Sequence, residues 1–165
     1  MKKLFVVLFA ILAFSTEIFA QVSQTALASA TIITPIAIAW GSDMNFGNVA
    51  SSVNPGSVTL TPAGARSTLG GVTLPATTGT VTAASFTVTG EAGFTYVITL
   101  PASVIISSGG NNMTVDNFTS TPSGTGTLTA GTSTLTVGAR LNVLANQPAG
   151  AYISGTPFTV TVNYN

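Results

Sequence analysis

Outside its first 20 residues, the chain carries five charged side chains: Asp43, Arg66, Glu91, Asp116 and Arg140. The 165 residues contain no cysteine and no histidine, which excludes Ser–His and Cys–His nucleophilic pairs and histidine-based metal sites. The three carboxylates are far apart in the sequence, whereas a calcium loop needs several close together. Nothing places two of them as the acid pair of a glycoside hydrolase. We therefore expect no enzyme activity, no cofactor and no metal.

The same five side chains have ordinary structural roles available. The carboxylates lie in or near predicted turns, where they usually accept hydrogen bonds from backbone N–H groups. The arginines are expected on the solvated surface. Two arginines against three carboxylates cannot form a basic patch, so we expect no nucleic-acid partner and no small-molecule substrate. Trp40, the only tryptophan, is expected in the core, although a sugar-binding platform is an alternative.

The first 20 residues follow the order of a secretory signal peptide. Lys2 and Lys3 make a basic head, residues 4–14 are uninterruptedly apolar, and a short polar segment, residues 15–17, comes before a stretch that ends at Ala20. The apolar run is too short to span a bilayer as a helix. This order predicts export and cleavage after Ala20. An uncleaved anchor is the alternative.

The remainder of the chain is patterned for β-strands in one domain. Short alternating runs are separated by Gly, Pro, Asn and Ser clusters, and no segment combines helical spacing with caps. The longest alternation places the following side chains on one face: Leu135, Val137, Ala139, Leu141 and Val143. We expect an all-β sandwich or barrel.

Other alternating runs predict a hairpin and part of the core. Residues 84–89 and 94–100, separated by Gly90-Glu91-Ala92-Gly93, have the pattern of a β-hairpin. The apolar register of the alternating runs predicts these buried residues: Phe86, Ile98, Leu141, Phe158 and Val160.

Both ends of the predicted mature chain alternate. The last strand directs one set of side chains to one face: Phe158, Val160, Val162 and Tyr164. A terminal strand this apolar needs a partner, or it is an exposed edge. The segment 21–33 has smaller residues in two registers. One register is apolar (Ala26, Ala28, Ala30 and Ile32), and the other is half polar (Leu27, Ser29, Thr31 and Ile33).

These landmarks, in this order, resemble the archaic, spore-coat-U-like chaperone–usher pilins, and also related secreted bacterial domains of unassigned function. The features that carry the resemblance are the alternating segment 26–33, Asn45-Phe46-Gly47, the segment 85–90 running into 96–100, and Gly150-Ala151-Tyr152 before the terminal strand. The resemblance covers nearly all of residues 21–165. Many relatives have cysteines near the end of the tail, where this chain has Pro35, so the end of the donor strand is not fixed.

The resemblance implies an immunoglobulin-like antiparallel sandwich, residues 34–165, that lacks its last strand. It further implies that residues 21–33 are a donor strand completing a neighbouring copy. The implied partners are a periplasmic chaperone, an outer-membrane usher and copies of the chain in a surface fimbria. The donor contacts would come from Ala26, Ala28, Ala30 and Ile32, and the edge contacts from the terminal strand.

Three other interpretations are distinguishable. A self-contained secreted sandwich, acting as an adhesive or carbohydrate-binding module, would use the tail as its own first strand. An outer-membrane barrel requires a polar interior and aromatic girdles, for which this sequence has too few charged and aromatic residues. An enzyme would need catalytic groups that the sequence does not bring together.

Overall fold

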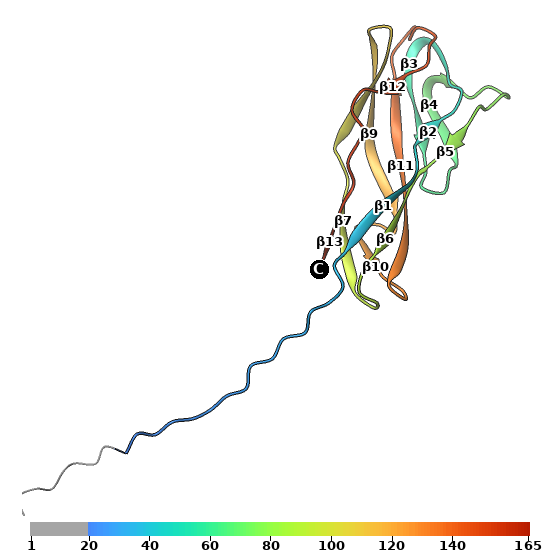
Figure 1. The fold of residues 1–165 in the computed structure, drawn as a ribbon. Coiled ribbons are helices and arrows are strands. Elements are labelled where there is room, and N and C mark those ends of the chain that lie inside the picture. Colours follow the sequence, from blue (N-terminus) through green and yellow to red (C-terminus); the bar gives the residue numbers. More distant parts are fainter. Residues whose placement is uncertain (1–19) are drawn as a thin grey trace, which may run out of the picture. The chain divides into compact units, whose positions relative to one another are not determined.

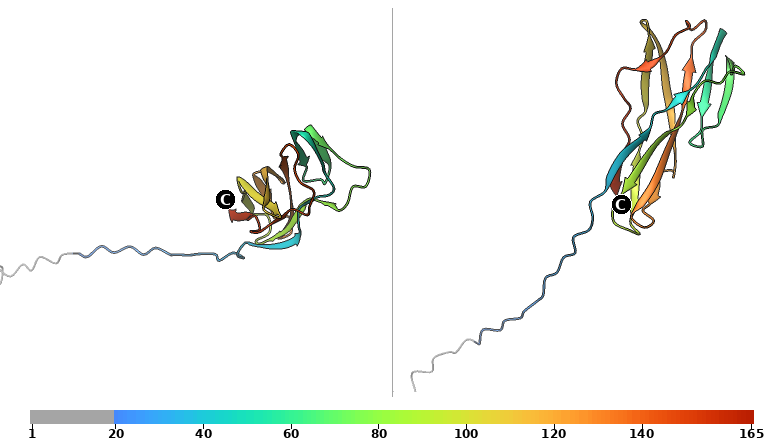
Figure 2. Two further views of the ribbon diagram at one scale, coloured as in Figure 1. Left: turned by 90° about the horizontal axis from the view of Figure 1, so that it is seen from above. Right: turned by 45° about the vertical axis from the view of Figure 1, so that its right-hand side comes forward.

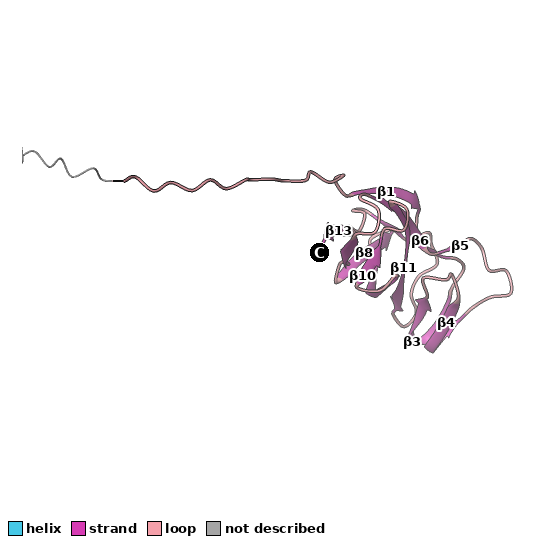
Figure 3. Cartoon of the chain, turned by 90° about the horizontal axis from the view of Figure 1, so that it is seen from below, coloured by secondary structure: helices cyan, strands magenta, loops and turns pink. Residues whose placement is uncertain are grey.

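The computed structural model describes residues 20–165, so the predicted signal peptide, apart from Ala20, lies outside the described residues. The chain divides into two units, one ending at Ile32 and one comprising Ile33–Asn165. Residues 20–32 form no helix or strand (Figure 3). All their side chains are exposed. All described regular elements are strands of the second unit (Figure 1). Within residues 20–165, no helix is long and apolar enough to cross a membrane.

The larger sheet is antiparallel and has β11 near its middle. Its main path runs in the order β1 (Ala37–Ser42), β6 (Ala84–Thr89), β11 (Thr132–Val143), β9 (Asn111–Thr121), β8 (Ser103–Ser108) and β12 (Ile153–Ser154). A hairpin of β3 (Ala50–Leu60) and β4 (Arg66–Thr73) joins this sheet by pairing with the second half of β11 (Figure 2).

The second sheet has three strands, in the order β10 (Thr125–Thr127), β7 (Thr95–Thr99) and β13 (Thr161–Tyr164). A two-stranded ladder joins β2 (Asn45–Phe46) to β5 (Val81–Thr82). One core cluster takes buried residues from both main sheets, among them Val88 and Leu135 of the larger sheet and Tyr96 and Val162 of the smaller. The protein is therefore an all-β antiparallel sandwich, as the sequence predicts.

The topology is that of an immunoglobulin-like sandwich. In that fold the strands A, B, E and D form one sheet, and C, F and G form the other. Here β1, β6, β11 and β9 occupy the A, B, E and D places, while β7 and β13 occupy the C and F places. The chain visits these places in the order A to F. The elements β2 to β5 are an insertion between A and B, and they pack against β9 and β11 in a second core cluster that includes Val58, Leu60 and Leu141.

The central position of β11 follows from its sequence. Its predicted inner face is buried along its whole length, from Leu135 at 0% exposed to Val143 at 4%. The strand is paired on both sides, with β6 and β3 on one side and β9 on the other. The outward Thr134 is exposed. The predicted register of this strand is confirmed.

The predicted hairpin of residues 84–100 is wrong. β6 pairs with β1 and β11, whereas β7 pairs with β10 and β13 in the other sheet. The connection Gly90-Glu91-Ala92-Gly93 crosses from one sheet to the other. Its backbone bonds go to the loop before β11, with Gly90 N–H donating to Gly131 and Gly93 N–H donating to Leu128. Alternation identifies the buried face of a strand, but it does not identify the neighbour.

The predicted core is largely confirmed, with two half-buried members. Ile98, Leu141 and Val160 are buried. Phe86 and Phe158 are half-buried and pack against the core cluster that includes Leu135. The terminal strand is shorter than its alternation predicts, because only Thr161–Tyr164 pairs with β7. Pro157 lacks a backbone N–H and limits the ladder upstream.

Phe158→Ala is expected to destabilise the domain moderately. The ring of Phe158 lies 5.1 Å from that of Phe118, so its removal leaves a partly open cavity. We expect a loss of about 2 kcal/mol, below the range of about 3–5 kcal/mol for a fully buried phenylalanine. Urea unfolding measures it. Thr159→Ala, which changes an exposed neighbour, should have little effect, and equal losses in the two variants would contradict the register.

Candidate functional site: an open edge and a clasp

The sandwich is open along one side, where β1 and β13 lie close together (Figure 1). β13 pairs with β7 on one side only, and within residues 20–165 no strand pairs with its other side. β1 is likewise an edge strand, paired only with β6. In an immunoglobulin-like sandwich, strand G pairs with strand F at the place beside β13. We call this pair of strand edges the open edge.

Trp40 lies on the core-facing side of β1 but is 69% exposed. It is the cross-strand partner of Phe86, which is in turn the partner of Leu135. Directly opposed residues project from the same face of a sheet, and Leu135 is completely buried. Trp40 was expected to be buried, and this prediction is wrong, although its side chain lies on the core-facing side of the sheet. The larger sheet extends to β1, but in the described residues nothing covers this tryptophan.

The indole of Trp40 is held in place by a carboxylate. Its Nε1–H donates to Asp43 Oδ1 at 3.0 Å. Asp43 thus accepts from a side chain, and not from the backbone of a turn as expected. This hydrogen bond fixes a large apolar surface at the open edge.

The predicted edge residues alternate along the last segment of the chain. Val160 and Val162 are buried, whereas Phe158 and Tyr164 are half-buried. Their side chains already contribute to the domain's own core. The groups that β13 leaves unpaired are backbone N–H and C=O groups. An added strand forms its hydrogen bonds with groups of this kind.

The predicted donor residues lie in the other unit. Ala26, Ala28, Ala30 and Ile32 are exposed and belong to no strand. Their contact with a neighbouring copy stays a prediction.

Three residues that are distant in the sequence meet at one end of the open edge, and we call them the clasp: Thr34, Glu91 and Tyr164. The Thr34 N–H donates to Glu91 Oε2 at 2.9 Å, and the Tyr164 hydroxyl donates to the Thr34 carbonyl at 2.7 Å. The Glu91 N–H donates to the same hydroxyl at 2.6 Å. Both backbone groups of Thr34 are therefore bonded to side chains.

Two neighbouring residues set the position of the tyrosine. A Cβ atom on Gly90 would overlap the Tyr164 hydroxyl, so only glycine allows this approach. Phe94 packs edge-on against the Tyr164 ring at a centroid distance of 5.7 Å. The sequence does not indicate the clasp as a unit, because its members are 57 and 73 residues apart. The sequence predicts only that Glu91 accepts hydrogen bonds from backbone N–H groups.

The hydrogen bond from the Thr34 backbone N–H, followed by that from the Thr34 side chain, lowers the pKa of Glu91 below its usual value. A carboxylate whose pKa is lower in the folded state stabilises that state at higher pH. The stabilisation is present above the unfolded-state pKa and is lost as the pH falls through the folded-state pKa. The clasp is therefore expected to weaken in acid.

A family model described as "Domain of unknown function (DUF4402)" matches residues 36–164, which is nearly the whole of the folded unit. The chain belongs to the DUF4402 family. No curated protein and no solved structure matched the chain. The match begins after Thr34, so the family model covers β1 to β13 and two members of the clasp.

The two arginines of this DUF4402 domain are not buried, and the Arg140 side chain is 40% exposed, but both are bound to protein groups. Arg140 on β11 pairs with Asp116 on β9, with Nε–Oδ1 at 2.9 Å and Nη2–Oδ2 at 3.2 Å. The hydrogen bond from Arg140 lowers the pKa of Asp116, and the same contact raises the pKa of Arg140. Asp116 therefore lies in a strand ion pair and not in a turn.

Arg66 also has a structural role. Its Nη1 donates to the carbonyls of Phe46 at 2.6 Å and Asn48 at 3.0 Å, and so joins β4 to the segment around β2.

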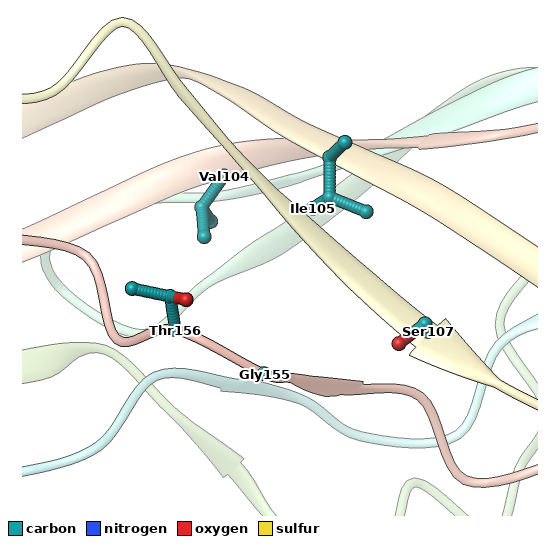
Figure 4. A pocket seen from close by; sticks show the side chains of 5 residues that line it. All are labelled: Val104, Ile105, Ser107, Gly155 and Thr156. Carbon is teal, nitrogen blue, oxygen red and sulfur yellow. The ribbon is translucent and has the colours of Figure 1, made fainter.

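The DUF4402 domain also has a shallow pocket beside β8, lined by Val104, Ile105, Ser107, Gly155 and Thr156, with a volume of about 380 Å³ (Figure 4). β12 pairs with β8 over only two residues. The pocket lies where the chain continues past the end of β12, beside β8. The pocket has no charged side chain. Within residues 20–165 there is no cluster of three or more Asp, Glu, His or Cys side chains that could hold a metal ion.

Proposed function

We propose that this protein is a structural, non-enzymatic subunit of a surface filament, assembled by donor-strand exchange along a chaperone–usher route. The observation that carries the proposal is the place beside β13. The sandwich has strands in the A to F places, and in the described residues the G place is empty. A strand supplied by another copy would complete the fold.

Two further features support strand addition at this place. The unpaired backbone of β13 offers the hydrogen bonds of a new ladder. The exposed Trp40 faces the core side and offers apolar surface to a strand that lies over β1. At about 25 cal/mol for each Å² of apolar surface, covering a large aromatic side chain stabilises a complex substantially.

The proposed donor is the segment 21–33 of a second copy. Its alternating register of Ala26, Ala28, Ala30 and Ile32 is apolar and small, which suits insertion beside bulky side chains such as Trp40. The segment is exposed in the described residues. Before assembly, a periplasmic chaperone would cover the open edge, and an outer-membrane usher would be the place of exchange and export.

A self-contained adhesive or carbohydrate-binding module is the second candidate. One observation favours it: Val160 and Val162 are buried and both core clusters form without an added strand. In the described residues no buried side-chain polar atom lacks a hydrogen-bond partner.

The fluorescence of the single tryptophan provides the test. A synthetic peptide of residues 21–33, added during refolding of a chain that begins at residue 34, is expected to shift the Trp40 emission to shorter wavelength and to raise Tm. The physical reason is burial of an indole that is 69% exposed without the strand.

The same peptide with Ala28→Asp is the matched control. It should neither shift the Trp40 emission nor raise Tm. If the chain from residue 34 refolds as a stable monomer whose emission and Tm do not respond to the peptide, the self-contained module is the better description.

A further inference from the structure

We propose that the clasp of Thr34, Glu91 and Tyr164 is an acid-operated lock on one end of the open edge. While Glu91 is ionised, the lock holds the first residues of the folded unit against the end of β13. When Glu91 takes up a proton, the lock opens. The expected effect of the lock on assembly rests on the proposed function. The lock itself is a property of the folded unit.

The lock lies at a decisive point in the chain. Thr34 directly precedes Pro35, which has no backbone N–H, and β1 begins at Ala37. The Thr34 N–H is therefore the last backbone donor before the proline, and Glu91 accepts it. Tyr164 is the last residue of β13, and its hydroxyl donates a hydrogen bond to the carbonyl of Thr34. The start of the domain and its final strand are thus joined through one residue.

The charge of Glu91 is what makes the lock sensitive to acid. A hydrogen bond to a carboxylate is about twice as strong as one to a neutral acceptor, so protonation weakens the bond from Thr34. The group that faces Glu91 from β13 is the Tyr164 hydroxyl, which bonds the Glu91 N–H. The other four charged residues of the folded unit make their contacts elsewhere. Asp43 accepts from Trp40, Arg66 donates to the carbonyls of Phe46 and Asn48, and Asp116 pairs with Arg140.

The direction of the response follows from the lowered pKa of Glu91. The lock is closed above the ordinary carboxyl range and opens as the pH falls through the lowered folded-state pKa of Glu91. Opening loosens residues 33–36 at the Thr34 N–H, whereas the Tyr164 hydroxyl keeps its bonds to the Thr34 carbonyl and the Glu91 N–H. A strand added along β13 would then lie beside a loosened end, and we expect assembled copies to separate more readily in acid.

The lock is tested by hydrogen exchange of the mature chain, residues 21–165, at pH values from 7 to 3. The exchange is measured by mass spectrometry. Rates are divided by those of an unstructured reference peptide at each pH. In the peptide covering residues 33–40, the Thr34 amide is expected to lose protection by about fivefold as Glu91 is protonated, since its hydrogen bond to a charged acceptor becomes one to a neutral acceptor.

Glu91→Gln keeps an acceptor oxygen but does not titrate, so its protection should not change with pH. Tyr164→Phe, which removes the bond to the Thr34 carbonyl, should show lower protection than the parent chain at the Thr34 amide at every pH. Asp116→Asn, which removes a carboxylate that pairs with Arg140 away from the clasp and the open edge, should keep the pH response of the parent chain at the Thr34 amide. Identical pH profiles for the parent chain and Glu91→Gln, or loss of the response in Asp116→Asn, would overturn the lock.

These exchange measurements do not depend on assembly. A chain that forms no fibres but shows the Glu91 response retains the lock and contradicts only the proposed function. A chain that forms fibres without that response contradicts only the lock.

Discussion

Ala28→Asp is expected to abolish assembly of the mature chain into fibres. In the proposed donor register, Ala28 points into the sandwich of the neighbouring copy, where an unpaired carboxylate costs several kcal/mol. Because this cost recurs at every junction, even a modest loss at each one stops growth of the filament. Electron microscopy, together with a heat-resistant ladder on a denaturing gel, measures the result.

Ser29→Asp is the matched control, because it places the same charge one residue away. Side chains of a strand alternate between faces, so a shift of one residue turns the charge outward. This variant should assemble almost normally. Fibres from Ala28→Asp, or their loss in both variants, would show that the register of Ala26, Ala28, Ala30 and Ile32 is not the inserted one.

Leu135→Ala is expected to cause the largest loss of stability of any single change considered for the folded unit. Leu135 is 0% exposed and belongs to the core cluster that both sheets share. Truncating a fully buried leucine removes apolar contact and leaves a cavity, at a cost of about 2–5 kcal/mol. Urea unfolding of the mature chain, followed by circular dichroism, gives the free energy of unfolding.

Thr134→Ala serves as the control on the same strand. Thr134 is exposed on the outer face of β11 and pairs across the strands with Thr87. Substitutions at such positions usually change stability by no more than about 0.5 kcal/mol. If Thr134→Ala destabilised the protein as much as Leu135→Ala, the assignment of the inner face of β11 would be wrong.

The contrast between Leu135 and Trp40 marks how far the sequence predicts this fold. Alternation gave the correct buried face of β11, because burial on one side imposes a period of two on the residue types. The same reasoning expected Trp40 in the core, and its orientation agrees. Its 69% exposure follows from β1 being an edge strand with nothing over it in the described residues, and alternation within one strand does not indicate its place in the sheet.

Partners of strands were harder to predict than faces. Residues 84–89 and 94–100 were expected to pair because they are adjacent, yet they belong to different sheets. Long-range polar contacts gave still less signal. Arg66 reaches carbonyls 18 and 20 residues away, and the clasp joins residues with no fixed spacing. A glutamate between glycines and a tyrosine near the end of the chain were the only hints.

The central position of β11 also determines when this protein is able to fold. Three strands that precede it in the chain, β3, β6 and β9, all pair directly with it. These segments have no common partner until residues 132–143 are also free to fold. Folding must therefore wait for the last third of the chain, and such non-local pairing is slow. A product truncated before Thr132 would retain several apolar strands with unpaired edges, and we expect it to aggregate instead of forming a smaller domain.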